Sequence, residues 1–232
     1  MALAGVALAG VVLSSVVLIF GVTAHAQLAA LPGVHPVSGR QYAQTMSVEG
    51  AAWLDRRERI DEEDPDRALR LIRVAKGSTV ADVGAGSGYF SLRLAKLVGP
   101  EGRIYASDIQ PGMLDLLQKN AARAKATNVL PVLGSINDPK LPVGTIDMAI
   151  MVDVYHEFSQ PQAMLARLRD ALKPGGRLVL LEYRAEDPDV PILPSHKMTK
   201  AQVKLEVEHE GFTQVRVYDD LPRQHLIVFT RP

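Results

Sequence analysis

A glycine-rich loop between two apolar segments offers the chain a place to hold a small ligand. Its pattern is D-x-G-x-G-x-G, with Asp82, Gly84 and Gly86 in the first three fixed positions. Glycine lets a backbone turn sharply and approach a ligand closely, and the helix expected next would present free amide groups there. The dinucleotide-binding pattern G-x-G-x-x-G needs a third glycine at position 89, where this chain has Tyr89. The Asp82 carboxylate instead suits a ligand with an ammonium group and would repel a pyrophosphate.

A second carboxylate, Asp108, ends the next expected strand 24 residues after Gly84. At this spacing a strand-end carboxylate can accept hydrogen bonds from both hydroxyls of a ribose. Together with Asp82, it predicts a ligand built from a nucleoside with a cationic amino-acid tail. The alternative is that the glycines form a packing turn and Asp108 lies at the surface.

The segment Tyr155-His156-Glu157 holds the side chains best suited to proton transfer. It follows another expected strand, and open α/β sheets bind ligands beyond the carboxyl ends of their strands. His156 is the first catalytic candidate, because the ordinary pKa of imidazole is near neutrality, and Tyr155 and Glu157 stand beside it. The alternative for His156 is a capping or packing role in its loop.

Glu182 and Arg184 end the following strand and are predicted to contact the substrate at the same rim. Arg184 could hold a carboxylate or phosphate of an acceptor, or could pair with a neighbouring acid. No pair of histidines and no carboxylate cluster has a spacing typical of metal sites, so no metal is predicted.

Strands and helices alternate along the chain and would position these residues. Single helices between strands imply right-handed crossovers and a mostly parallel, doubly wound sheet, with the last two strands as an antiparallel hairpin at its edge. This is an α/β fold with a seven-stranded sheet. The expected strands are 79–86, 103–109, 129–135, 145–154, 177–183, 213–219 and 225–231, and the expected helices are 47–59, 66–74, 89–99, 111–124, 161–172 and 199–211.

Composition narrows the classes of function. The 232 residues include 26 Lys and Arg against 26 Asp and Glu, and no Cys. A net charge of zero gives no general attraction to nucleic acid, so no nucleic-acid partner is expected. The absence of Cys excludes disulfides, thiolate zinc sites and cysteine nucleophiles. The mixed charges of residues 55–67 predict a solvated face.

The first 26 residues predict a targeting segment. They contain no Lys, Arg, Asp or Glu and end in an A-x-A pattern before Gln27, which predicts a signal peptide and an exported, periplasmic protein. The alternative is a retained membrane anchor with a cytoplasmic domain, since about 20 apolar residues can span a bilayer. Only then would the membrane be a partner. Residues 27–46 are expected to form a linker, and residues 47–232 a single domain with a helical N-terminal extension.

Four motifs in this order resemble those of the class I S-adenosylmethionine-dependent methyltransferases, over roughly residues 68–230. They are ADVGAGSGYF, YASDIQ, IDMAIMVDVYHEF and ALKPGGRLVLLEY. The run that includes EGAAWLDR and LPRQHLIVF resembles a bacterial subgroup that is often predicted to be exported. The resemblance implies a Rossmann-like methyltransferase domain with S-adenosylmethionine as its cofactor.

The resemblance also implies roles for individual residues at the cofactor. Asp82 would face the methionine amino group, while Gly84 and Gly86 let the backbone pass under the cofactor. Asp108 would hold the ribose, with Ile109 packed on the adenine.

Three further regions of the site follow from the same resemblance. Many relatives have Gly-Asp after the third strand, but here Ser135 follows the glycine, so adenine recognition is assigned to Ser135, Ile136 or Asn137. Asp153, at the end of the fourth strand, would face the site. An N-terminal helix commonly covers the cofactor in this family, so Trp53 is expected either to contact the substrate or to pack in the core.

The leading hypothesis is in-line transfer of a methyl group from S-adenosylmethionine to a small-molecule acceptor. In such a reaction the enzyme mainly aligns the nucleophile, the methyl group and the sulfur. Two alternatives are a nicotinamide-dependent oxidoreductase and a protein that binds S-adenosylmethionine without turnover.

Overall fold

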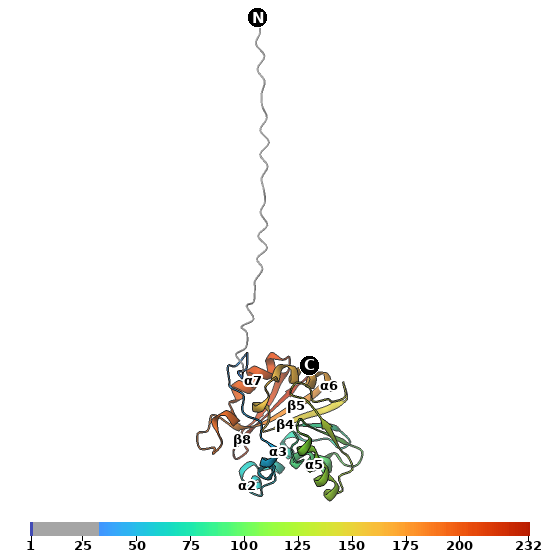
Figure 1. The fold of residues 1–232 in the computed structure, drawn as a ribbon. Helices are drawn as coiled ribbons and strands as arrows, with labels where there is room; N and C mark the ends of the chain where they lie inside the picture. The colour runs from blue at the N-terminus through green and yellow to red at the C-terminus, as the bar shows by residue number, and fades with distance from the viewer. Residues whose placement is uncertain (2–32) are drawn as a thin grey trace.

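The computed structural model describes Met1 and residues 33–232 (Figure 1). The predicted signal peptide or anchor, apart from Met1, lies outside the described residues, as does the start of the expected linker. Among the described residues, no helix is both long enough and apolar enough to cross a membrane.

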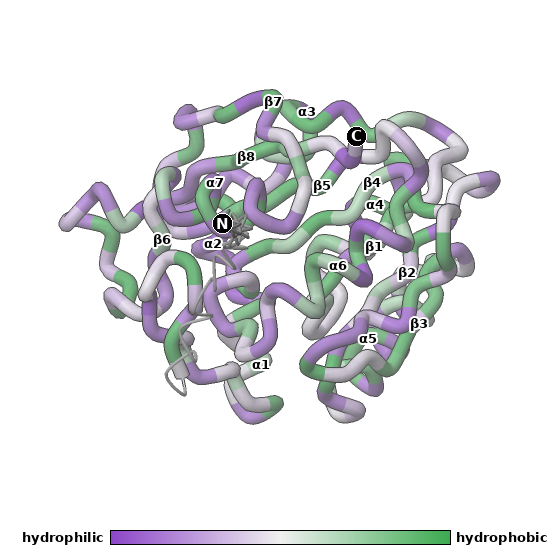
Figure 2. The backbone as a smooth tube through the Cα atoms, turned by 90° about the horizontal axis from the view of Figure 1, so that it is seen from above, coloured by the Kyte–Doolittle hydropathy of each residue, from purple (hydrophilic) through white to green (hydrophobic). Residues whose placement is uncertain are grey.

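A twisted sheet runs through the middle of the molecule, in the strand order β3-β2-β1-β4-β5-β8-β7, which Figure 2 shows from above. Strands β1 to β5 are parallel to one another, while β8 is antiparallel to both β5 and β7. The predicted doubly wound, mostly parallel sheet with its antiparallel C-terminal hairpin is therefore confirmed. The bounds are β1 Thr79–Val83, β2 Arg103–Asp108, β3 Val129–Leu133, β4 Ile146–Val152, β5 Leu172–Arg184, β7 Thr213–Tyr218 and β8 Gln224–Thr230.

Helices cover both faces of the sheet, as Figure 1 shows. Successive strand residues point to opposite faces, so Val80, Ile104 and Ile150 pack with α3, α4 and α5 while Ala81 and Met151 pack with α6 and α7. The two apolar clusters form the core and hold the strand ends in a fixed arrangement. The bounds are α3 Pro65–Ile72, α4 Tyr89–Val98, α5 Pro111–Ala124, α6 Pro161–Ala171 and α7 Lys200–His209.

Two segments differ from the expected elements near the sheet. Residues 173–176, which lie between the expected helix 161–172 and the expected strand 177–183, are part of β5, which begins at Leu172 and pairs with β4 through an irregularity between Ile146 and Met148. A short strand, β6 (Lys197–Met198), pairs with the end of β5 and was not predicted. Two residues carry too little pattern to be recognised as a strand.

The helix expected at 47–59 is broken into three short pieces: η1 (Val48–Gly50), α1 (Ala51–Leu54) and α2 (Arg59–Glu63). The guanidinium of Arg56 donates to the carbonyl of Trp53, and that of Arg59 donates to the carbonyl of Leu54, at 2.8 Å each. These side chains satisfy carbonyls that a continuing helix would bond to backbone amides, so the chain turns after Leu54.

Residues 33–46 fall in the range predicted as a linker, and they pack along the domain. Arg40 is buried and forms an ion pair of 3.0 Å with the buried carboxylate of Glu206 on α7. Its Nη1 also donates to the carbonyl of His156 at 2.9 Å, and the amide of Ala43 donates to the same carbonyl at 3.0 Å. The segment therefore attaches to α7 and supports the loop that carries His156.

We predict that Glu206→Ala lowers the free energy of unfolding by about 3–5 kcal/mol, because it leaves the Arg40 charge buried without its partner. Urea titration followed by circular dichroism measures the change. The control is Lys204→Ala on the same helix, whose half-exposed side chain should matter by less than about 0.5 kcal/mol. Equal losses in the two variants would contradict this account of the ion pair.

Candidate active site

A cavity of about 410 Å³ lies at the carboxyl ends of the central strands. Its volume is typical of ligand sites, which measure about 300–1,000 Å³. The glycine loop, the ends of β2 and β4, the segment 45–63 and the segment 191–196 contribute to its walls. The predicted site residues that line it are Trp53, Asp82, Gly84, Gly86, Asp108, Ile109, Ser135, Ile136, Asp153, His156 and Glu157.

The two glycines of the loop are required by the fold of the protein itself. Gly84 has φ +72° and Gly86 has φ +53°, both in the left-handed region. A Cβ atom at Gly84 would overlap the side chain of Val154, and one at Gly86 would lie 2.7 Å from Cδ1 of Leu54. Packing thus accounts for the glycines, and the evidence for a ligand lies in the carboxylates beside them.

Asp108, the last residue of β2, is a buried carboxylate that can accept further hydrogen bonds. One of its oxygens accepts from the amide of Gly86 and the other from the amide of Gln110, at 2.9 Å each. The amide of Ile109 also contributes a hydrogen bond, and because a carboxylate has about four acceptor positions, Asp108 keeps capacity for a ligand at the cavity. Burial raises the pKa of Asp108, while the backbone amides oppose that shift.

Asp82, in β1, is a second carboxylate on the cavity wall and is only 2% exposed. Its Oδ2 accepts a hydrogen bond of 2.6 Å from the Ser91 hydroxyl. Burial raises the pKa of Asp82 to about 6, despite that bond. A cationic ligand group in the cavity would offset the cost of its negative charge.

Asp153, directly after β4, has a strained backbone and an unsatisfied oxygen. Its φ of +50° is uncommon for a residue with a side chain. Oδ2 accepts from Gln224 at 2.7 Å, whereas Oδ1 is buried without a hydrogen-bond partner among the described residues. Burial and the nearby carboxylates of Glu63 and Glu182 raise its pKa well above the ordinary value.

The charged segment 55–67 was predicted to be a solvated face, and this is wrong for Arg59 and Glu63. Both are buried, both line the cavity, and they form an ion pair with 2.7 Å between Nη2 and Oε2. Glu63 also accepts a hydrogen bond of 2.8 Å from the hydroxyl of Tyr183, near the end of β5. Helical spacing places Arg59 and Glu63 on one face, i and i+4, while their neighbours in the sequence face solvent. That spacing was the only signal available in the sequence.

His156 is held at the far end of the cavity by Glu182. Its Nδ1 lies 2.6 Å from Oε2 of the fully buried Glu182, whose Oε1 accepts from the amide of Tyr155 at 3.0 Å. Burial alone would lower the pKa of His156, but the Glu182 carboxylate outweighs it and raises the pKa. Because Nδ1 is committed to Glu182, Nε2 is the nitrogen left for a ligand.

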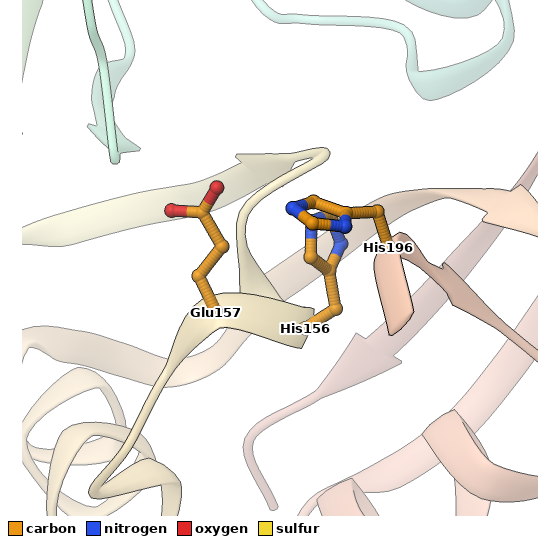
Figure 3. A group of neighbouring side chains, drawn as sticks. All are labelled: His156, Glu157 and His196. Atoms are coloured by element: carbon orange, nitrogen blue, oxygen red, sulfur yellow. The ribbon is translucent and has the colours of Figure 1, made fainter. Parts of the chain in front are cut away.

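Two more titratable side chains lie beside His156, as Figure 3 shows. Burial raises the pKa of Glu157 to about 7, and its Oε1 accepts from the amide of Met46 at 3.3 Å. The ring centroids of His196 and His156 are 5.1 Å apart, and burial lowers the pKa of His196. From the sequence alone, His196 is only a possible residue of this rim, and a structural role is favoured.

Four predicted site residues do not line the cavity. Tyr155 is fully buried in the core, with its ring 5.4 Å from the guanidinium carbon of Arg40. Asn137 hydrogen-bonds Ser135 and does not line the cavity. Glu182 contacts His156 rather than the cavity itself.

Arg184 is the fourth, and it is committed to structure. Its guanidinium donates to the carbonyl of Leu221 at 2.8 Å and to that of Pro222, so it holds the turn between β7 and β8. It also forms an ion pair of 3.7 Å with Asp187, so the pairing with a neighbouring acid considered from the sequence is present, beside the contacts to backbone carbonyls.

We predict that Asp82→Asn stabilises the ligand-free protein above pH 6 and has little effect below pH 4. The folded-state pKa of about 6 lies above the ordinary 3.8, so ionisation costs stability as pH rises between those values. The gain should approach about 3 kcal/mol above pH 6. Chemical denaturation at pH 4 and pH 8 measures it. The exposed Asp115→Asn is the control, and a gain that is equal at both pH values would contradict the assignment.

The geometry agrees with comparisons to known proteins. Residues 75–218 match the family model of the methyltransferase domain. A protein-L-isoaspartate O-methyltransferase from Methanothrix thermoacetophila is 30% identical over 113 residues, which are 47% of this chain and 50% of that protein. A tRNA U34 carboxymethyltransferase from Pseudoalteromonas translucida is 32% identical over 169 residues, 66% of this chain and 50% of that protein. The chain spans about half the length of these curated relatives.

A solved structure extends the similarity to nearly the whole fold. A SAM-dependent methyltransferase from Aquifex aeolicus has a TM-score of 0.77 and 26% identity, covering 81% of this chain and all of that one. The family model covers more than half of the chain. The chain therefore belongs to the methyltransferase-domain family, the class I enzymes whose cofactor is S-adenosylmethionine.

Proposed function

We propose that this protein transfers the methyl group of S-adenosylmethionine to a small-molecule acceptor bound in the cavity. One observation carries the proposal: Asp82 and Asp108, on neighbouring strands, are buried carboxylates that line the same cavity as the group of His156 and Glu157. The first two can bind the cofactor, and the second two can bind the acceptor.

The residues present fit the parts of the cofactor. The remaining acceptor capacity of Asp108 suits the ribose hydroxyls, and the Asp82 carboxylate suits the ammonium group. Arg59, a buried cation on the cavity wall, is paired with Glu63 and can in addition attract the carboxylate of the methionine part. Ile109 and Ile136, both exposed at the cavity, offer apolar surfaces for the adenine.

At the other end of the cavity, His156 is the group that takes up a proton. Bound S-adenosylmethionine supplies an electrophilic methyl group, and an acceptor hydroxyl or amine loses a proton as it is methylated. Nε2 of His156 accepts that proton, and the Glu182 carboxylate at Nδ1 stabilises the resulting imidazolium. Glu157 borders the same space, and its raised pKa makes it a second proton carrier near neutrality.

The proposal of a small acceptor is supported by the shape and charge of the protein. The segment 45–63 contributes Trp53, Leu54 and Arg59 to the cavity walls, so the acceptor must fit under it. The net charge of zero gives no attraction to a nucleic acid. The relatives named above act on protein and tRNA, so substrate class varies among proteins of this fold.

We predict that S-adenosylmethionine binds to the purified full chain with one-to-one stoichiometry, and that Asp108→Ala weakens binding at least tenfold, about 1.4 kcal/mol. Calorimetric titration in mild detergent measures both, with the exposed Asp115→Ala as the control. A folded protein that gives neither heat nor a thermal shift would overturn the proposal, and binding of NADH instead would favour an oxidoreductase. Binding by the wild type justifies a screen of small hydroxyl and amine acceptors.

The pH dependence of the same titration tests the role of Asp82. An ammonium group binds to the ionised carboxylate, and the pKa of about 6 means that Asp82 becomes protonated below that value. Affinity should therefore decrease up to about tenfold per pH unit below pH 6, and Asp82→Asn should remove this dependence.

We also propose that residues 1–26 direct export, which is supported by their lack of charged residues and by the A-x-A pattern before Gln27. Expression of the full chain in a bacterial host should yield a periplasmic protein whose N-terminus is Gln27, as determined by N-terminal sequencing. Recovery of the chain with its first residues intact in the membrane fraction would support the anchor instead.

A further inference from the structure

Three side chains with good metal-ligand atoms converge at the acceptor end of the cavity. His156 and Glu157 lie on the short helix η2 (Tyr155–Glu157), and His196 ends the short helix η3 (Pro194–His196). One ligand atom from each lies within 4.8 Å of the other two, and all three residues line the cavity (Figure 3). His196 is 40 positions after His156, so no spacing in the sequence could indicate the group.

The surroundings of His156 are those of a metal-binding imidazole. Histidine ligands usually donate their other ring N–H to a carboxylate, which fixes the tautomer and makes the free nitrogen more basic. Glu182 occupies that position at 2.6 Å from Nδ1. Nδ1 of His196 is likewise engaged, 3.0 Å from the Ser195 hydroxyl. In His156, Nε2 is thus the nitrogen available to a ligand, and the His196 ring also makes a hydrogen bond to the backbone of Gln44 that a bound ion would have to replace or leave in place.

The charge around the group favours a cation. Glu157 has no Lys or Arg within ion-pair distance in the part of the chain that the structure describes, and it is half-buried at the cavity. Glu182 and Asp153 add carboxylates nearby, and the cation closest to Asp153, Arg59, is 3.9 Å away and already paired with Glu63. A bound ion would balance the charge of Glu157 and reduce its repulsion with the neighbouring carboxylate of Glu182.

We propose that His156, Glu157 and His196 bind one divalent transition-metal ion such as Zn²⁺, with an open coordination position facing the cavity. Two imidazole nitrogens, one carboxylate oxygen and one open position form a set typical of catalytic zinc sites. Bonds of about 2.0–2.1 Å in a tetrahedron place the ligand atoms about 3.3 Å apart, so side-chain rotations must bring them closer by up to about 1.5 Å.

The role of the ion rests on the proposed function and deepens it, whereas ion binding itself does not depend on it. An acceptor hydroxyl in the open position would have a lower pKa, because the ion stabilises the oxyanion. Its proton would leave to solvent water, because the ion occupies the lone pair of His156 Nε2 that serves as base in the metal-free protein. The oxygen then forms a bond to the methyl carbon as the carbon–sulfur bond breaks and its electron pair remains on sulfur.

The test is titration of Zn²⁺ into the chelator-treated full chain by calorimetry, with Co²⁺ followed by visible absorption. We expect one ion per chain, and His196→Ala should weaken binding at least tenfold. The matched control is His209→Ala, an exposed histidine at the end of α7 that does not line the cavity. Unchanged binding in His196→Ala, or no binding by the wild type, would overturn the proposal.

A second variant tests Glu182, whose carboxylate hydrogen-bonds the proposed ligand His156. Glu182→Gln leaves all three ligands in place and should weaken Zn²⁺ binding about 10–100-fold, with circular dichroism as the check that the variant is folded. Unchanged affinity in a folded Glu182→Gln would contradict the orienting role.

Titration of S-adenosylmethionine into the same samples separates this inference from the proposed function. Cofactor binding without Zn²⁺ binding overturns only the metal site. Zn²⁺ binding that is lost in His196→Ala, without cofactor binding, supports the metal site and overturns the proposed function.

Discussion

Four neighbouring parallel strands each place one carboxylate at the same edge of the sheet. Much of the site serves to stabilise these buried like charges. Asp82 lies in β1, Asp108 ends β2, Asp153 follows β4, and Glu182 lies near the end of β5. Like charges in a buried space oppose one another, and burial raises the pKa of the first three. Amides of the glycine loop stabilise Asp108, and the imidazole of His156 stabilises Glu182.

The N-terminal segment supplies cations that the strand ends lack. Arg59 reaches the cavity wall through a pair with Glu63, and Arg40 crosses to Glu206 on α7 while it supports the His156 loop. The chain before the first strand is therefore part of the site rather than an addition to it. This arrangement also explains why the glycine loop has little space: Leu54 lies directly over Gly86.

Most of the predicted cofactor residues line the cavity, whereas the predictions for the acceptor end were less accurate. Asp82 and Asp108 could be placed because a parallel sheet brings successive strand ends together whatever the details of packing. The direction of the Tyr155 side chain could not be predicted, because neighbouring residues of a short 3₁₀ helix point in different directions. In the structure the ring is buried beside Arg40, which comes from a distant part of the chain. The pairing of Arg184 with a nearby acid could be foreseen, but its contacts to the backbone carbonyls of a later turn could not.

The sequence by itself determined the alternation of strands and helices, the parallel order that follows from it, and the position of the glycine loop between the two strand-end acids. These features depend on local patterns of apolar residues and turns, which the neighbouring residues largely specify. Only the tertiary structure decided that Arg59 and Glu63 are buried, that Glu182 orients His156, and that His196 lies beside it. Those contacts join segments far apart in the chain, or depend on how the N-terminal segment folds over the sheet, and their geometry is set by packing across the whole domain.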